Sequence, residues 1–319
     1  MKPGLLLIGD ATQRMLDRFD AEFTVHKLAE IDDLQAWLAE NGEGIIAVAT
    51  NGHAGVKPEI MAGLPNLKVV SCYGVGYDGV DTDACVERGI LVAHTPNVLN
   101  DDVANTAILL MLAASRDLVF NDAYVRAGRW EKEGNTPLTR SPEGKTYGIV
   151  GLGRIGETIA EKLAAFNARV VYHSRNKKDG VDYEYYPDLV KMAEDSDYLI
   201  VITPGGAATD KLVNKQVIEA LGPQGTLINV ARGTVVDEEE MVKALSDGRL
   251  GWAGLDVFRE EPKVPSELYD LDNVTLLPHV ASATHETRQA MGDLVCQNLS
   301  SFLKDGTVET PVPECAHLQ

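Results

Sequence analysis

Three ionisable side chains follow apolar segments late in the chain, and together they suit acid–base chemistry on a molecule that carries a carboxylate. Arg232 follows residues 227–231, Glu261 follows 255–258, and His279 follows 276–278. A guanidinium binds a carboxylate through paired hydrogen bonds, an imidazole moves protons, and a neighbouring carboxylate orients the imidazole and favours its charged form. If the three apolar segments are parallel strands of one sheet, these side chains reach the same edge of it. We therefore predict Arg232, Glu261 and His279 as catalytic residues.

A glycine-rich turn at residues 151–156 predicts a dinucleotide site. The sequence Gly-Leu-Gly-Arg-Ile-Gly lies between an expected buried strand and an expected helix. In that context Gly151 permits a tight turn, Gly153 lets the backbone approach a pyrophosphate, and Gly156 lets the helix pack on the strand. The first turn of the helix, with Arg154 and Ile155, then offers N–H groups and a partial positive charge to the phosphates.

The end of the next expected strand, residues 169–172, indicates which dinucleotide binds. Enzymes that use NAD place Asp or Glu there for the ribose hydroxyls, whereas this chain continues with His173, Ser174, Arg175, Asn176, Lys177 and Lys178. A carboxylate would repel a 2′-phosphate, while a hydroxyl and a guanidinium bind one. The sequence therefore predicts NADPH/NADP+ as the cofactor, held in part by Ser174, Arg175 and Lys177.

The overall charge narrows the range of partners. The 319 residues carry a formal net charge of −19 at pH 7, which argues against nucleic acid or an anionic membrane surface as a partner. NADPH and an acidic substrate are themselves anions, so their site must be a basic island in an acidic protein. The candidates for that island are Arg154, Arg175, Lys177, Lys178 and Arg232.

Cysteine usage and the apolar runs indicate a cytoplasmic, reduced protein. The 4 cysteines lie far apart with no metal-ligand spacing, so no metal site is expected. Cys72 and Cys296 fall in apolar stretches and are expected to be core thiols. The apolar residues 5–8 are too few for a signal peptide, and no apolar run approaches the ~20 residues of a membrane span.

Two successive α/β patterns predict an α/β fold of two doubly wound, parallel-sheet (Rossmann-like) domains with a cleft between them. The first pattern has expected strands at 5–8, 45–49, 67–71 and 91–93; the second has them at 147–150, 169–172, 198–202, 225–229, 254–257 and 274–277. The helix expected at about 286–303 follows the last strand and must pack on a domain already built. We therefore predict a discontinuous substrate-binding domain, 1–98 plus 288–319, and an NADP-binding domain, 99–287.

A long helical stretch, 103–127, separates the two patterns. It is apolar nearly all round from 104 to 114, and such a helix is buried between domains or subunits. We therefore predict a homodimer. Trp130, just beyond the stretch, either reaches the neighbouring subunit or is a core residue.

The order and spacing of these motifs resemble the D-isomer-specific 2-hydroxyacid dehydrogenase family over nearly the whole chain. The segments that carry the resemblance are 151–156, 229–233 with 235–238, 248–250, 253–258 with 261–262, and 277–279 with 282–284. Within the family, residues 97–99, 101–104 and 172–175 look like those of the glyoxylate/hydroxypyruvate reductase branch.

The resemblance implies a role for individual residues. Arg232 would bind the substrate carboxylate, helped by backbone N–H groups of Val75 and Gly76, and His279 would exchange the proton while paired with Glu261. Asp256 would hold the nicotinamide amide, although it is also a plausible helix cap or turn residue. The cofactor would further contact Thr203, Pro204, Val230, Ala231 and His279.

The implied activity is NADPH-dependent reduction of small 2-oxo acids to D-2-hydroxy acids. Residues 51–55 and 73–77 are expected at the far end of the substrate pocket; they are small and polar, which favours glyoxylate or hydroxypyruvate. Two alternatives remain open. One is a dehydrogenase for another 2-oxo acid, of the phenylpyruvate type or 2-ketogluconate, and the other is a non-catalytic, dinucleotide-sensing scaffold of the same fold.

Overall fold

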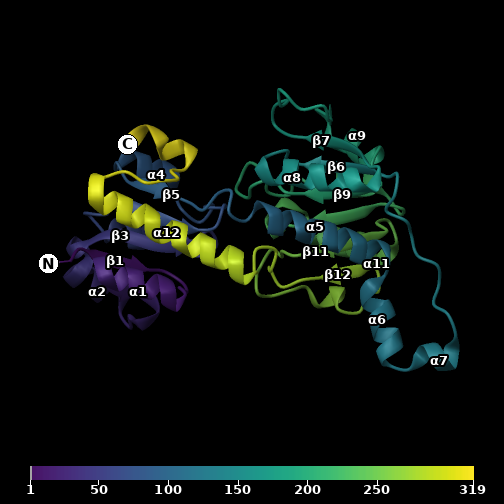
Figure 1. The fold of residues 1–319 in the computed structure, drawn as a ribbon, viewed down its shortest axis with the longest axis horizontal. Helices are drawn as coiled ribbons and strands as arrows, with labels where there is room; N and C mark the ends of the chain where they lie inside the picture. The colour runs from purple at the N-terminus through teal and green to yellow at the C-terminus, as the bar shows by residue number, and fades with distance from the viewer. Residues whose placement is uncertain (1) are drawn as a thin grey trace. The chain divides into compact units, whose positions relative to one another are not determined.

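The protein consists of two compact α/β units (Figure 1). A computed structural model describes residues 2–319. The first unit comprises Met1–Leu99 and Thr284–Gln319, and the second comprises Asn100–Ala283. The C-terminal segment thus returns to the unit in which the chain begins.

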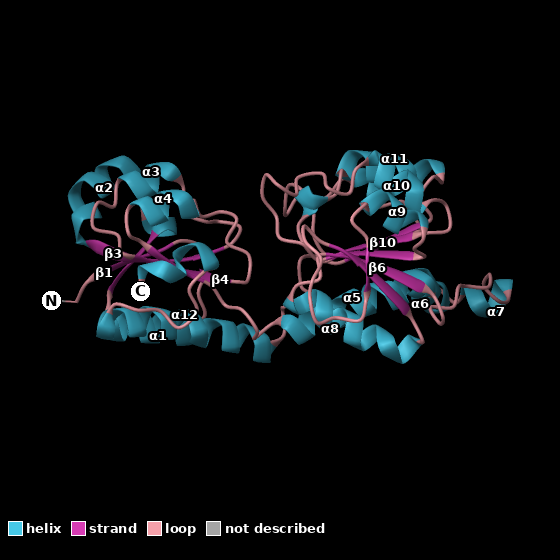
Figure 2. Cartoon of the chain, turned by 90° about the horizontal axis from the view of Figure 1, so that it is seen from above, coloured by secondary structure: helices cyan, strands magenta, loops and turns pink. Residues whose placement is uncertain are grey.

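The first unit is a parallel sheet with helices on both faces (Figure 2). Among the described residues its five strands have the order β2-β1-β3-β4-β5. Their bounds are β1 Gly4–Leu7, β2 Thr24–Lys27, β3 Ile45–Asn51, β4 Val69–Tyr73 and β5 Leu91–Ala93. Helices α2 (Leu34–Asn41), α3 (Pro58–Ala62) and α4 (Thr82–Glu87) cover one face, while α1 (Gln13–Glu22) and α12 (His285–Asp305) cover the other.

The central strands of this sheet are continuously apolar because both faces are covered. Leu5, Leu6, Val48 and Val70 are fully buried. Strand β2, at the edge, has the sequence Thr-Val-His-Lys and is only partly buried. Strand β2 is not among the strands predicted from the sequence, because it has no apolar run to mark it.

The second unit is a larger sheet of the same kind. In the described part of the chain its seven strands have the order β12-β11-β10-β9-β6-β7-β8. Their bounds are β6 Thr146–Val150, β7 Arg169–His173, β8 Glu184–Tyr185, β9 Tyr198–Val201, β10 Thr226–Asn229, β11 Trp252–Leu255 and β12 Val274–Leu276. All the pairings are parallel, so every carboxyl end lies at one edge.

Helices cover both faces of this second sheet as well (Figure 2). Helices α5 (Asn100–Ser115) and α8 (Arg154–Leu163) lie on one face, and α9 (Leu189–Glu194), α10 (Lys215–Leu221) and α11 (Glu238–Asp247) lie on the other. The predicted fold class, α/β with two doubly wound parallel sheets, is confirmed.

The single helical stretch predicted for 103–127 is wrong. Helix α5 ends at Ser115, α6 runs from Leu118 to Arg126 at a 63° bend, and α7 (Arg129–Glu133) follows. The bend lies at Asp117, whose φ of 44° is left-handed and interrupts the helix. No single helix in residues 2–319 meets the length and hydropathy of a membrane span; the bent pair α5 and α6 does so together, by length and composition only.

Candidate active site

The glycine turn between β6 and α8 has the geometry that a bound dinucleotide requires. Gly151 has a φ of +104°, and a Cβ there would lie 2.9 Å from the Thr203 backbone. A Cβ on Gly156 would lie 2.3 Å from the Gly151 carbonyl oxygen, so helix and turn touch. A Cβ on Gly153 would meet nothing within 4 Å. The backbone of Gly153 is thus open to a ligand, while Gly151 and Gly156 allow the close contacts of the turn.

The loop after β7 is folded by its own hydrogen bonds. The buried Tyr172 hydroxyl accepts from the Lys178 N–H at 2.9 Å, and the Tyr185 hydroxyl donates to the Ser174 carbonyl at 3.2 Å. The Ser174 hydroxyl donates to the Asn176 carbonyl at 2.6 Å. The Ser174 hydroxyl therefore uses its hydrogen within the loop, and its oxygen can still accept a hydrogen bond from a partner.

The basic side chains of this loop are not equivalent. Lys178 Nζ lies 2.7 Å from Glu157 Oε2, in the first turn of α8, and 3.5 Å from the Leu152 carbonyl. Arg175 and Lys177 are exposed, and neither takes part in an ion pair found among residues 2–319. Arg175 and Lys177 therefore keep their charge for a ligand, whereas that of Lys178 is offset by Glu157.

A buried amide shapes the turn that carries Arg232. Asn229, at the end of β10, donates to the Arg232 carbonyl and accepts from the Ala231 N–H, each at 3.0 Å. A Cβ on Gly233 would lie 1.9 Å from the Phe258 carbonyl carbon, so this turn packs directly on the one that leads to Glu261. In the sequence, Asn229 and Gly233 are recognisable only as part of the motif at 229–233; in the structure they position Arg232.

Glu261 and His279 meet, as their places after β11 and β12 suggest. The Nδ1 atom of His279 lies 2.6 Å from Oε2 of Glu261, and the Phe258 N–H donates to Oε1 at 3.0 Å. The glutamate side chain is 19% exposed and the histidine 41%. Glu261 thus fixes Nδ1 as the protonated nitrogen and leaves Nε2 for a reacting molecule.

His279 is held in an unusual backbone conformation. Its φ is 53°, which is left-handed and uncommon for a residue with a side chain. The His279 N–H donates to the Asp256 carbonyl at 2.8 Å. The two carboxylate oxygens of Asp256 accept from the N–H groups of Val280 and Ala281, at 2.8 and 2.9 Å. One residue therefore binds three consecutive N–H groups and sets the position of the imidazole.

Asp256, which the resemblance places beside the nicotinamide, is fully buried. Burial raises the pKa of its carboxyl, while the N–H groups of Val280 and Ala281 and the charge of His279 oppose that rise. In the described conformation both oxygens of its carboxylate accept hydrogen bonds from the backbone directly after His279.

In the first unit, the loop Gly74-Val75-Gly76 follows β4 and is held from one side. The Gly74 N–H donates to the Thr95 hydroxyl at 3.0 Å, and the Thr95 N–H donates to the Gly74 carbonyl at 2.8 Å. His94 Nδ1 donates to the Val75 carbonyl at 2.9 Å. No hydrogen bond within residues 2–319 uses the N–H of Val75 or Gly76, so both donors remain for a ligand. His94 and Thr95 were not identified from the sequence.

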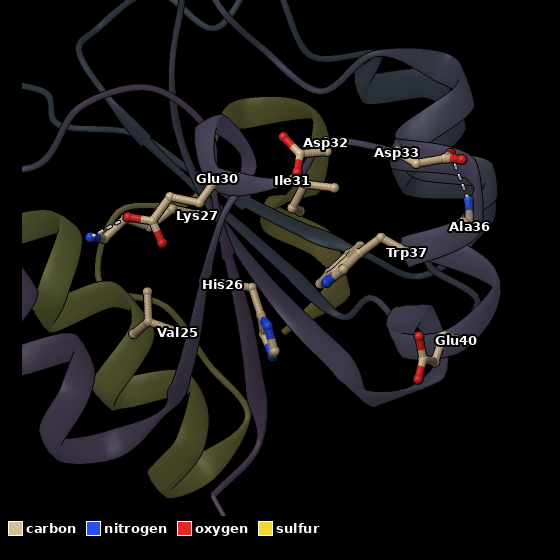
Figure 3. Close-up of a pocket in the computed structure, with 10 residues that line it drawn as sticks. All are labelled: Val25, His26, Lys27, Glu30, Ile31, Asp32, Asp33, Ala36, Trp37 and Glu40. Carbon is tan, nitrogen blue, oxygen red and sulfur yellow. Dashed lines mark hydrogen bonds and ion pairs between the residues drawn. The ribbon is translucent and has the colours of Figure 1, made fainter.

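A groove of about 370 Å³ lies elsewhere on the first unit, beside β2 and α2 (Figure 3). Its wall holds the carboxylates of Glu30, Asp32, Asp33 and Glu40. Two of these have local partners, since Lys27 pairs with Glu30 and Asp33 accepts from the Ala36 N–H. A groove with four carboxylates and one lysine in its wall does not suit an anionic ligand, and none of the expected site residues lines it.

The remaining predicted residues belong to the turns just described. Arg154 and Ile155 open α8; Thr203 and Pro204 follow β9; Val230 and Ala231 follow β10 and are buried. Val75 and Gly76 belong to the first unit, and the others belong to the second.

Comparison with known proteins gives a consistent result. The model of the "D-isomer specific 2-hydroxyacid dehydrogenase, NAD binding domain" family matches residues 108–281. A glyoxylate/hydroxypyruvate reductase A of Arabidopsis thaliana is 44% identical over 97% of this chain and 98% of its own. A hydroxyphenylpyruvate reductase of Plectranthus scutellarioides is 45% identical over the same shares.

A solved structure is equally similar. It is described as the NADPH-dependent glyoxylate/hydroxypyruvate reductase of Sinorhizobium meliloti in complex with NADP and malonate. It superposes with a TM-score of 0.93 at 44% identity, over 99% of this chain and 98% of its own.

Replacing Asp256 tests the clamp that it forms on the His279 loop, in which its carboxylate oxygens accept from the N–H groups of Val280 and Ala281. In Asp256→Asn the amide nitrogen cannot accept from a backbone N–H, so a buried donor is left without a partner. We expect the free energy of unfolding to fall by about 1–3 kcal/mol, measured by urea denaturation. Asp272→Asn, at an exposed position that precedes β12, is the control. Equal stability of the two variants would show that the clamp contributes nothing.

Proposed function

The chain belongs to the D-isomer specific 2-hydroxyacid dehydrogenase family of oxidoreductases, and we propose that it reduces glyoxylate and hydroxypyruvate to D-2-hydroxy acids with NADPH. The observation that carries this proposal is the 2.6 Å contact between Glu261 and His279 at the sheet edge that also holds the glycine turn. The names of the Arabidopsis and Sinorhizobium relatives support the substrate class.

The chain's own residues account for binding and proton transfer. When bound, the nicotinamide supplies a hydride to the keto carbon of the substrate. Arg232 binds the substrate carboxylate, together with the N–H groups of Val75 and Gly76. His279 Nε2 gives its proton to the oxygen on which negative charge develops, and Nδ1 keeps its hydrogen bond to Glu261 throughout.

The loop after β7 supports the choice of NADPH over NADH. Arg175 and Lys177 are exposed cations whose charge is not offset by a described carboxylate. A guanidinium and an ammonium at this strand end suit the extra phosphate of NADPH. The Sinorhizobium relative is itself named NADPH-dependent.

A second candidate substrate class has one specific observation in its favour. The Plectranthus relative, at 45% identity, is named for an aromatic 2-oxo acid. Against it stand the small, polar residues at 51–55 in the first unit. The non-catalytic scaffold is disfavoured, because relatives that match nearly the whole chain at 44% and 45% identity are named as reductases.

We propose a reducing, cytoplasmic location for the protein. All four cysteines in the described residues are free and buried, which supports the proposed reducing, cytoplasmic location.

A panel of 2-oxo acids with His279→Ala tests the proposed reaction. The wild type should oxidise NADPH with glyoxylate and hydroxypyruvate, and less readily with phenylpyruvate or 2-ketogluconate. His279→Ala should lower kcat by roughly 10²–10⁴, the share of general acid catalysis, and leave NADPH binding intact. His285→Ala, at an exposed position six residues further on, is the control. Near-normal turnover in His279→Ala would remove this residue from the mechanism.

Cofactor preference is tested at Arg175. Arg175→Ala removes the charge-assisted contact with the 2′-phosphate, so it should weaken NADPH binding by roughly 10- to 150-fold. It should leave NADH binding nearly unchanged, because NADH has no phosphate there. Fluorescence titration of both cofactors measures the effect. Arg169→Ala serves as the control, since this exposed arginine on β7 pairs with Glu184. Equal weakening of both cofactors would contradict the proposal.

The homodimer is proposed from the surface between residues 109 and 138. Its large apolar side chains are exposed in the single chain, and Leu138 is 100% exposed. The set consists of Leu109, Leu118, Val119, Val125, Trp130 and Leu138. Apolar side chains gathered on neighbouring segments mark a surface that another protein covers.

Sedimentation velocity at micromolar concentration should therefore give a dimer. Val119→Lys should shift the protein toward the monomer, because the ammonium would be buried in the interface. Leu303→Lys, at an exposed apolar position on α12, should not. A monomeric wild type rules the dimer out.

A further inference from the structure

We propose that Arg288 selects among 2-oxo acids by binding a hydrogen-bond acceptor beyond the keto carbon, of which the hydroxyl of hydroxypyruvate is the smallest. This inference rests on the proposed function, and in particular on the role of the Gly74-Val75-Gly76 loop in binding the substrate carboxylate. Arg288 and the loop belong to the same unit, so their arrangement is described by the structure.

The position of Arg288 is not explained by the stability of its helix. It lies in the first turn of α12, where its N–H donates to the Thr284 carbonyl at 3.0 Å. The positive end of the helix dipole disfavours a cation there. No ion pair found among residues 2–319 includes Arg288, and the partner of its guanidinium in the structure is the Tyr73 side chain. In a chain with a net charge of −19, this cation is kept without a carboxylate.

Tyr73 connects Arg288 to the substrate loop. The guanidinium carbon of Arg288 lies 5.6 Å from the centre of the Tyr73 ring, and the Tyr73 hydroxyl donates to the Arg288 carbonyl at 2.8 Å. Tyr73 is the last residue of β4, directly before Gly74. The ring therefore holds the arginine beside the start of the loop, through a cation–π contact to the side chain and a hydrogen bond to the backbone.

Packing keeps the first turns of α12 close to this tyrosine. A Cβ on Gly292 would lie 3.7 Å from Tyr73 Cε2 and 2.9 Å from Met15 Sδ. Glycine at 292 thus lets the helix lie against both β4 and α1. On its other side, the loop is fixed by Thr95 and His94. Tyr73 therefore links the guanidinium of Arg288 to the strand that leads into the loop.

This arrangement predicts a particular order of substrates. A 2-oxo acid whose carboxylate is bound by the Val75 and Gly76 N–H groups extends its carbon chain away from the loop. The C3 hydroxyl of hydroxypyruvate can accept from Arg288. The methyl group of pyruvate, of similar size, cannot accept, and glyoxylate has no C3 atom. A site that binds a hydroxyl by hydrogen bonding rejects the analogue that lacks it.

Substitution of Arg288 with three substrates tests the inference. In Arg288→Leu we expect kcat/KM for hydroxypyruvate to fall roughly 10- to 100-fold, with values for glyoxylate and pyruvate within about three-fold of wild type. Arg288→Lys should recover part of the loss, since its ammonium can still donate. Tyr73→Phe, which removes the contacts of the hydroxyl with Arg288 and keeps the ring, should cause a smaller loss that is again confined to hydroxypyruvate.

Arg14→Leu is the matched control, because Arg14 is an exposed arginine of the same unit that pairs with Asp293 on α12. It should leave all three substrates unaffected. The ratio of kcat/KM for hydroxypyruvate to kcat/KM for pyruvate is measured in both Arg288→Leu and Arg288→Gln. If thermal melting shows that one variant folds poorly, the other variant still provides the test.

The two proposals fail in different ways. If the wild type reduces none of the three acids with NADPH, the proposed function is wrong and this inference is wrong with it. If the wild type is active but the Arg288 variants lose all three substrates equally, or none of them, only the inference is overturned.

Discussion

The placement of one imidazole depends on the buried carboxylate of Asp256. His279 has a left-handed backbone conformation, which a residue with a side chain adopts at some cost. Three N–H groups, those of residues 279, 280 and 281, donate to the carbonyl and carboxylate of Asp256 and offset that cost. Because Asp256 directly follows β11, the sheet itself carries the histidine to within 2.6 Å of Glu261.

Charge is the second constraint. A chain with a net charge of −19 must still attract an anionic cofactor and an anionic substrate. The helix N-terminus at the glycine turn contributes positive potential without a charged residue. Glu157 lies in that same first turn, and Lys178 offsets it at 2.7 Å. The pair also ties the loop after β7 to the glycine turn, so the two regions expected to bind phosphate are joined by a contact between them.

Features that depend on consecutive residues could be predicted from the sequence. Features that depend on contacts between residues far apart in the sequence could not. The glycine turn was predictable because β6, the three glycines and α8 are consecutive and each glycine has a distinct steric role. Strand β2 was missed because an edge strand that is only partly buried needs no apolar run. The break at Asp117 was missed because a left-handed residue within an apolar segment leaves no compositional mark. The bonds from Asp256 to residues 24 and 25 positions away require the folded sheet.

On the proposed function, chemistry and substrate recognition are divided between the units. The second unit holds the cofactor turn, the proton-transfer pair and Arg232, all on turns that follow strands of one sheet. The first unit holds the Val75 and Gly76 N–H groups and, through Tyr73, Arg288. Residues of the first unit can therefore vary the accepted carbon chain without moving the histidine, because Asp256 and Glu261 hold it from within the second unit. A family built in this way can change its substrate while it keeps its reaction, and that is consistent with relatives of about equal identity being named for glyoxylate and for an aromatic 2-oxo acid.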